Sequence, residues 1–242
     1  TTLPFANPNY WIGTTDTDWN KTSNWTDSRL PLPYTTVEFA TTANNNGNPA
    51  VNDLHVPIGT PKNVGDLINL SDKSLVVPPA ASITVTGTVT GSETADKADK
   101  IKINAANDGT TPNGTFIATA ACSNFDVYGT VELFAQGQKV STPAWTDALT
   151  GSPTAGDELK SSHSWQHFGV PVEKVMALDA FKKSWIQLYN EKQNGKFQGA
   201  TKPATFYDKW NFVGAYDDLF AFLGYEITQD VPKVYTIQGK LN

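Results

Sequence analysis

The stretch L-V-V-P-P-A-A-S-I-T-V-T-G-T-V, residues 75–89, decides the fold class, because short apolar runs alternate in it with turn-forming residues. Runs rich in Val, Ile and Thr that end at Pro, Gly or Ser are typical of short β-strands. Similar apolar clusters, none longer than five residues, recur at 54–58, 67–70, 101–103 and 116–117. This spacing predicts an all-β fold whose N-terminal region is either β-solenoid-like, with short strands stacked on one another, or a β-sandwich.

The motif W-I-G-T-T-D-T-D-W-N-K-T-S-N-W, residues 11–25, places three Trp within fifteen residues near the N-terminus. A buried aromatic side chain removes about 150–250 Å² from water, so these rings need a surface to pack against. We expect the motif to form a folded plug, an N-terminal Trp cap that closes one end of a long β structure.

The same motif holds a candidate calcium site. Asp16, Asp18 and Asn20 have the i, i+2, i+4 spacing of oxygen ligands that opens a calcium-binding loop. Lys21 and Asp27 occupy the positions where such a loop has Gly and Glu. The alternative is that the three side chains cap tight turns. The sequence indicates no other cofactor.

The last third of the chain has a different pattern. Residues 141–160 are rich in Gly, Pro, Ser and Thr, which predicts a linker or surface loop between a region at 1–140 and a module at 161–242. The module has a helix-like pattern at 173–184. It also has strand-like runs at 185–190, 219–228 and 234–241. We therefore expect the module to be a smaller, aromatic-rich β-sandwich with one or two short helices.

Composition excludes several classes of function. The net charge is −6, and Arg29 is the only arginine among eighteen basic residues. A nucleic-acid partner is disfavoured, because phosphate binding needs clustered Lys and Arg. Cys122 is the single cysteine, which rules out an internal disulfide and a multi-cysteine zinc site.

The composition also indicates a location for the protein. No run approaches the roughly 18–20 apolar residues that span a membrane, and no signal peptide is recognisable. Abundant Thr, Asn, Gly and Ser, with 17% charged residues, are typical of a β-rich extracellular protein. Because the chain starts at Thr1, we expect a mature or excised segment.

The patterns that would indicate catalysis are weak. Adjacent carboxylates occur at 157–158 and at 217–218, but neighbours on a strand point to opposite faces. Neither pair therefore predicts the two facing carboxylates of a glycoside hydrolase. His163 and His167 are four apart, which on a strand separates them by about 13 Å, too far for one metal ion. A single Arg also argues against a polysaccharide lyase.

Aromatic residues raise a glycan-binding hypothesis, because rings stack on sugar faces and the chain has seven Trp. Trp145 has polar neighbours and is the first candidate, and Trp210 in Y-D-K-W-N-F is the second. We expect the other five Trp to anchor the core.

Five motifs follow one another along nearly the whole chain, namely W-x-G-x-x-D-x-D-W-x-x-x-x-N-W, T-G-T-V, S-W-Q-H-F-G-V-P-V, G-Y-E-I-T-Q and V-Y-T-I-Q-G-K-L. Their order resembles that of large secreted surface proteins of the Bacteroidota, which are adhesin-like or autotransporter-like β-helix proteins often exported by the type IX system. The resemblance implies a β-rich fold, an extracellular, cell-surface location and a chain that is a fragment of something longer.

We therefore hypothesise that the chain is a non-enzymatic, extracellular structural or adhesive segment of a bacterial surface protein. Its partners would be other surface-protein segments or subunits, or extracellular glycans. The first alternative is a carbohydrate-binding module that uses exposed Trp side chains, Trp145 and Trp210. A glycan-active enzyme is the less favoured alternative.

Overall fold

The computed structural model describes residues 9–119, 126–136, 165–182, 184–189, 210–229 and 231–242. Most of its regular structure is β-strand, and its helical segments are short: η1 (Thr22–Asn24) and η2 (Ala95–Lys100), both 3-10 helices, and α1 (Ala177–Ala180). The predicted all-β class is confirmed. The chain divides into two compact units: unit 1 is Thr1–Glu132 with Gln238–Leu241, and unit 2 is Leu133–Ile237 with Asn242. The segment predicted to be a linker, 141–160, lies outside the described residues.

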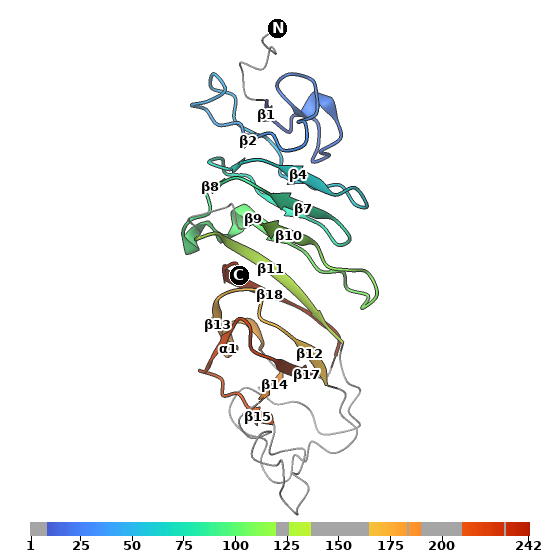
Figure 1. Ribbon diagram of the computed structural model, residues 1–242, viewed down its shortest axis with the longest axis vertical. Coiled ribbons are helices and arrows are strands. Elements are labelled where there is room, and N and C mark those ends of the chain that lie inside the picture. Colours follow the sequence, from blue (N-terminus) through green and yellow to red (C-terminus); the bar gives the residue numbers. More distant parts are fainter. Residues whose placement is uncertain (1–8, 120–125, 137–164, 183, 190–209, 230) are drawn as a thin grey trace, which may run out of the picture. The chain divides into compact units, whose positions relative to one another are not determined.

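Three sheets of short strands organise unit 1 (Figure 1). The first sheet has the order β1 (Tyr10–Trp11), β2 (Val37–Phe39), β5 (Leu67–Ile68), β8 (Val89–Thr90). The second has the order β10 (Thr115–Ala118), β7 (Ser82–Val85), β4 (Lys62–Val64). The third has the order β18 (Lys233–Lys240), β11 (Tyr128–Ala135), β9 (Ile101–Ile103), β6 (Leu75–Val77), β3 (Leu54–His55), and its strands β11 and β18 belong partly to unit 2.

Neighbouring strands from β1 to β11 run parallel in these sheets. The chain visits the first, third and second sheets in the same order three times, as β2–β3–β4, β5–β6–β7 and β8–β9–β10. The register aligns Val37 with Leu67 and Val89, Leu54 with Leu75 and Ile101, and Lys62 with Ile83 and Phe116. Each return therefore adds one strand to each sheet.

One cluster of buried apolar side chains fills unit 1. Alternation along the strands places it there: Val37 and Phe39 of β2 are fully buried, and Glu38 between them is half-buried. Ile83 and Val85 of β7 are buried in the same way. Burying each such side chain stabilises the fold by roughly 1.5–3 kcal/mol. The cluster also includes Leu54, Val56, Val64, Leu67, Leu75, Val77, Ile101 and the three Trp of the motif.

The motif at residues 11–25 lies against the first strands of the sheets. Trp25 forms a bridge with Trp11 of β1, and Asp18 forms a parallel bridge with His55 of β3. The backbone of residues 34–35 exchanges two hydrogen bonds of 2.9 Å with β4 and the residue after it. Backbone groups at the outer edges of β1, β3 and β4 are thus paired within unit 1.

Unit 2 contains two antiparallel sheets. The larger one has the order β12 (Gln166–Phe168), β17 (Tyr225–Thr228), β14 (Trp185–Tyr189), β15 (Trp210–Phe212). The smaller one pairs β13 (Lys174–Met176) with β16 (Asp218–Phe220), and α1 follows β13 directly. Phe168, Phe181, Tyr225 and Tyr235 pack together with ring centroids 5.1–5.6 Å apart, which gives this unit an aromatic core.

Two predicted elements of unit 2 differ in extent from those in the structure. The helix predicted at 173–184 is reduced to the four residues of α1, because β13 pairs with β16 and these sheet hydrogen bonds override the helical pattern. The strand predicted at 219–228 is divided into β16 and β17, because the backbone turns at Phe222, where φ is 61°. Among the described residues, no helix is long and apolar enough to cross a membrane.

Candidate functional site

Three indole rings form the centre of the N-terminal motif. Trp25 lies between Trp11 and Trp19 and meets both edge-on, with ring centroids 5.2 and 5.4 Å apart. All three side chains are buried. The indole N–H of Trp25 donates to the carbonyl of Trp19 at 2.9 Å, and that of Trp11 donates to the carbonyl of Asn52 at 2.8 Å. All three rings are therefore packed as parts of the core, and those of Trp11 and Trp25 are also hydrogen-bonded.

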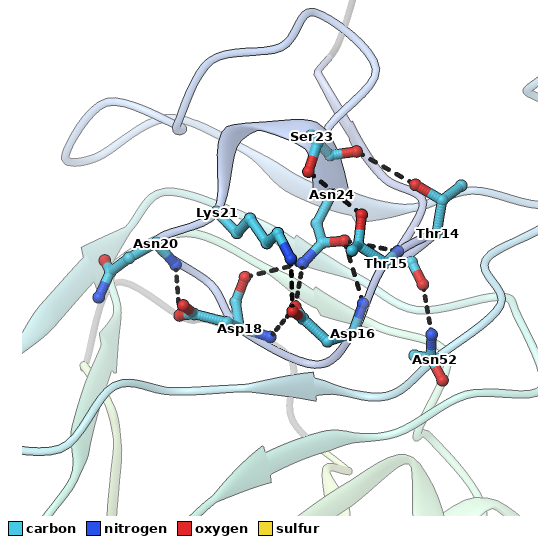
Figure 2. Close-up of polar contacts among 10 residues, drawn as sticks. Thr14, Thr15, Asp16, Asp18, Asn20, Lys21, Ser23, Asn24 and Asn52 are labelled. Carbon is cyan, nitrogen blue, oxygen red and sulfur yellow. Dashed lines mark hydrogen bonds and ion pairs between the residues drawn. The ribbon is translucent and has the colours of Figure 1, made fainter.

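Asn24 is the polar centre of the motif and is fully buried (Figure 2). Its Oδ1 accepts from the backbone N–H groups of Thr15 and Asp16, at 3.0 and 3.4 Å. Its Nδ2 donates to the carboxylate of Asp16 at 2.7 Å and to the carbonyl of Asp18 at 3.1 Å. Its own carbonyl accepts from Ile12 and Gly13. This one side chain fixes the loop that carries the candidate calcium ligands.

Asp16 is the first candidate ligand, and its carboxylate is already extensively paired. Besides Asn24, it accepts from the backbone N–H of Asp18 at 3.0 Å and from the Lys21 ammonium at 2.8 Å. The Lys21 hydrogen bond, with help from Asn24 and Asp18, lowers the pKa of Asp16 to about 2. The carboxylate is therefore ionised throughout the physiological range.

The side chains of Asp18 and Asn20, the other two candidate ligands, also accept hydrogen bonds. The Asp18 carboxylate accepts from the backbone N–H of Asn20 at 2.9 Å, and the Asn20 side-chain oxygen accepts from the Lys62 ammonium at 3.1 Å. Lys62 also lies over the Trp19 ring, 5.6 Å from its centroid. Figure 2 shows Asp16, Asp18 and Asn20 following one another along the turn. Each of the three candidate ligands thus takes part in turn hydrogen bonds, and calcium binding there stays a prediction.

No group of three or more His, Cys, Asp or Glu with the geometry of a metal site occurs in the part of the chain that the structure describes.

The sequence does not distinguish Asn24 from the Asn and Asp residues around it, but the structure does. Asn20 and Asn24 look alike in sequence, yet Asn20 is exposed and Asn24 is buried.

The glycan candidates are placed only in part. Trp145 lies outside the described residues. Trp210 begins β15 and is the cross-strand partner of Tyr189 in β14. Of the Trp expected in the core, Trp165 and Trp185 of unit 2 are half-buried.

The acidic pairs and histidines do not form a catalytic group among the described residues. Asp217 caps a turn by accepting from the backbone N–H of Gly214 at 2.7 Å. Asp218 forms an ion pair with Lys174 across the smaller sheet at 3.2 Å. His167 lies in β12, whereas His163 and residues 157–158 lie outside the described residues.

A buried polar row crosses the larger sheet of unit 2, and no sequence pattern predicted it. Glu226 in β17 is the direct cross-strand partner of Gln187 in β14 and of His167 in β12. Thr228, two residues further along β17, shares a face with Glu226 because side chains alternate along a strand. Burial raises the pKa of Glu226 to about 7. The three residues Gln187, Glu226 and Thr228 are at most 3% exposed.

An exposed apolar loop lies at the junction of β16 and β17. Phe222 is 91% exposed and holds a left-handed backbone, and Phe220 and Leu223 beside it are 46% and 42% exposed. Tyr216, just before β16, is 79% exposed. Exposed large apolar side chains are candidates for contact with a partner, and these four flank or end β16. We call Tyr216, Phe220, Phe222 and Leu223 the aromatic loop.

Comparisons with known proteins find one informative similarity. The chain is 36% identical over 244 aligned positions, 96% of its length, to the minor fimbrium subunit Mfa5 of Porphyromonas gingivalis. It spans 17% of the length of that relative. No protein-family profile and no solved structure match the chain.

The similarity bears on location. The chain is a distant homologue of part of a fimbrial protein from a member of the Bacteroidota. Fimbriae are appendages of the cell surface, so the predicted cell-surface location is confirmed, and the resemblance to Bacteroidota surface proteins is confirmed at this coarser level.

Proposed function

We propose that the chain is a non-enzymatic structural or adhesive segment of a fimbrium-type surface protein, with other subunits of the same appendage as its partners. The observation that carries this proposal is the similarity to a fimbrium subunit along almost the whole chain. The N-terminal motif is consistent with it, because its Trp and Asp side chains are engaged in packing and turns rather than in a reactive centre.

We assign unit 1 the role of a rigid spacer built as a β-solenoid. In a solenoid each coil supplies one strand to each of several parallel sheets and stacks on the coil before it. The three successive passes through the three sheets, all with parallel pairing, support this architecture over an antiparallel sandwich. Each coil of a solenoid contacts only the coils before and after it, so the stack grows along one axis. Such a unit suits a protein segment that extends from a cell.

We assign partner contact to the aromatic loop of unit 2. Aromatic residues are enriched in protein interfaces, where a few of them carry most of the binding energy. Phe222 combines near-complete exposure with a backbone conformation that a bulky residue rarely adopts, and such strain is often kept where it serves a function.

The test replaces Tyr216 and Phe222 with Ser in the full-length parent protein in its own bacterium. We expect the double variant to reach the surface but to co-purify with other fimbrial subunits at least tenfold less than wild type. The matched control replaces Val51 and Ile58, which are 56% and 65% exposed in unit 1, with Ser and should assemble normally. Equal incorporation of both double variants would remove the aromatic loop from the proposal, and a parent protein absent from surface appendages would reject the proposal as a whole.

The carbohydrate-binding alternative predicts a different result. A glycan array probed with wild type, Trp145→Ala and Trp210→Ala should then show binding that one of the substitutions abolishes. Binding to no glycan, or binding that neither substitution changes, would count against that alternative.

A further inference from the structure

The buried polar row of unit 2 has oxygen atoms that lack hydrogen-bond partners. Among the described residues, Gln187 Oε1, Glu226 Oε1 and Thr228 Oγ1 are buried and accept no hydrogen bond. Leaving one buried acceptor unpaired costs about 1–3 kcal/mol, and a charged one costs more. Three such atoms on neighbouring positions of one sheet face together favour a bound partner.

The geometry of the sheet brings these oxygens near one another. Glu226 and Gln187 are direct cross-strand partners, whose Cβ atoms in an antiparallel pair lie about 4.5–5.5 Å apart. Thr228 lies on the same face at the next position of that face along β17, about 7 Å further. Side chains of these lengths can direct their oxygens to a common point between the two strands.

The chemistry of the three groups selects the partner. A proton on Glu226 supplies one donor, and no hydrogen bond joins the three oxygens to one another. A water molecule can donate to Glu226 and Gln187 and accept from the Thr228 hydroxyl, but it leaves an ionised Glu226 carboxylate without a compensating charge. A cation is coordinated by carboxylate, amide and hydroxyl oxygens together and cancels the charge. Because the row has one carboxylate, a monovalent ion gives a neutral site, whereas a divalent ion leaves a buried positive charge.

We infer that Gln187, Glu226 and Thr228 form a buried binding site for an alkali-metal cation, Na⁺ or K⁺. The ion links β14 to β17 at the centre of the larger sheet of unit 2. The ion stabilises the folded state of that unit. This role is independent of the partner contacts assigned to the aromatic loop.

The first experiment follows thermal unfolding of the whole chain at pH 8. The chloride salts of Na⁺, K⁺ and N-methyl-D-glucamine are compared at equal ionic strength. We expect the unfolding midpoint to rise by about 3–5 °C, saturably, with Na⁺ or K⁺ and to stay constant with N-methyl-D-glucamine. Glu226→Gln should abolish the response, and Glu173→Gln, an exposed carboxylate in the same unit, should keep it. Equal effects of all three salts would overturn the inference.

The second experiment does not depend on a variant that folds. Crystals of the whole chain grown in RbCl should show an anomalous-scattering peak in contact with Gln187, Glu226 and Thr228. Rb⁺ stands in for K⁺, so a peak without anomalous signal, as water gives, or no peak at all, would overturn the K⁺ assignment and leave only Na⁺, which the first experiment tests.

Discussion

Asn24 donates a 2.7 Å hydrogen bond to the Asp16 carboxylate from the opposite side of the N-terminal loop, eight residues further along the chain. The same amide holds the carbonyl of Asp18 and the N–H of Thr15. A loop of Thr, Asp and Asn residues, which have little apolar surface, is thereby held against three Trp rings. The order of this loop depends on one buried amide.

Replacing Asn24 with Ala should therefore be strongly destabilising. The substitution leaves the N–H of Thr15 without its acceptor and removes a donor from the Asp16 carboxylate, at a combined cost of about 2–4 kcal/mol. Urea unfolding followed by Trp fluorescence measures this loss. Asn20→Ala is the control, because Asn20 is exposed, and it should change the free energy of unfolding by less than about 0.5 kcal/mol. Equal losses in the two variants would contradict the central role of Asn24.

Replacing Trp19 with Ala should cost about 3–5 kcal/mol, because the ring is 2% exposed and packs edge-on against Trp25. Differential scanning calorimetry of the whole chain checks the value. Tyr34→Ala, at a 64% exposed aromatic residue of the same unit, should have a much smaller effect. If the Trp19 variant is as stable as wild type, the ring does not anchor the motif.

Replacing Gly91 with Ala should disrupt the contact between neighbouring passes of the chain. Gly91 has a φ of 101°, and a Cβ there would lie 1.9 Å from the backbone oxygen of Asn69. Gly47 is the matched control, because its φ is 84° but a Cβ there meets nothing within 4 Å. We expect about 1 kcal/mol from strain alone at Gly47 and clearly more at Gly91. Thermal unfolding of both variants separates the two costs, and equal shifts would show that the close contact is absent.

The stability of the chain should depend on pH through Glu226. Its pKa is about 7 in the folded chain and near 4.5 when unfolded, so the folded state binds the proton more tightly. This contribution is fully present below pH 4.5 and is lost as the pH rises through 7.

In a buffer of N-methyl-D-glucamine, the free energy of unfolding of wild type should fall between pH 4.5 and 8 by on the order of 3 kcal/mol more than that of Glu226→Gln. Urea titrations at a series of pH values measure the difference between the two proteins. Parallel pH profiles would mean that Glu226 is not buried as the structure has it.

The sequence allowed the strands of unit 1 to be predicted but not their partners. The strands within residues 75–89 can be predicted from that run alone, because the preference of β-branched residues for strands and of Pro and Gly for turns is local. The pairing of Leu54 with Leu75 and of Leu75 with Ile101 joins residues that are far apart in the sequence, which no local pattern records. The helix-like pattern at 173–184 covers more residues than α1 for the same reason, since the partner of β13 lies far away in the sequence at β16.

The candidate site shows the same limit at the level of single residues. The size of the Trp rings predicted burial in the N-terminal motif, and Trp11, Trp19 and Trp25 are buried. Which polar residue would be buried with them depended on the path of the loop. Glu226 lies between Tyr225 and Ile227 and looks like an ordinary solvent-facing strand position, because what covers its face is set by the tertiary fold.

The paired outer edges of β1, β3 and β4 protect unit 1 from adding a further strand there. An open sheet edge is a template on which another chain can add a strand, and crowded proteins with such edges tend to join into uncontrolled fibrils. At this end, the backbone of the loop that contains Thr17 and Trp25 and that of residues 34–35 already occupy the hydrogen-bonding groups that an incoming strand would need. An incoming strand therefore finds the backbone groups at these outer edges of β1, β3 and β4 already paired.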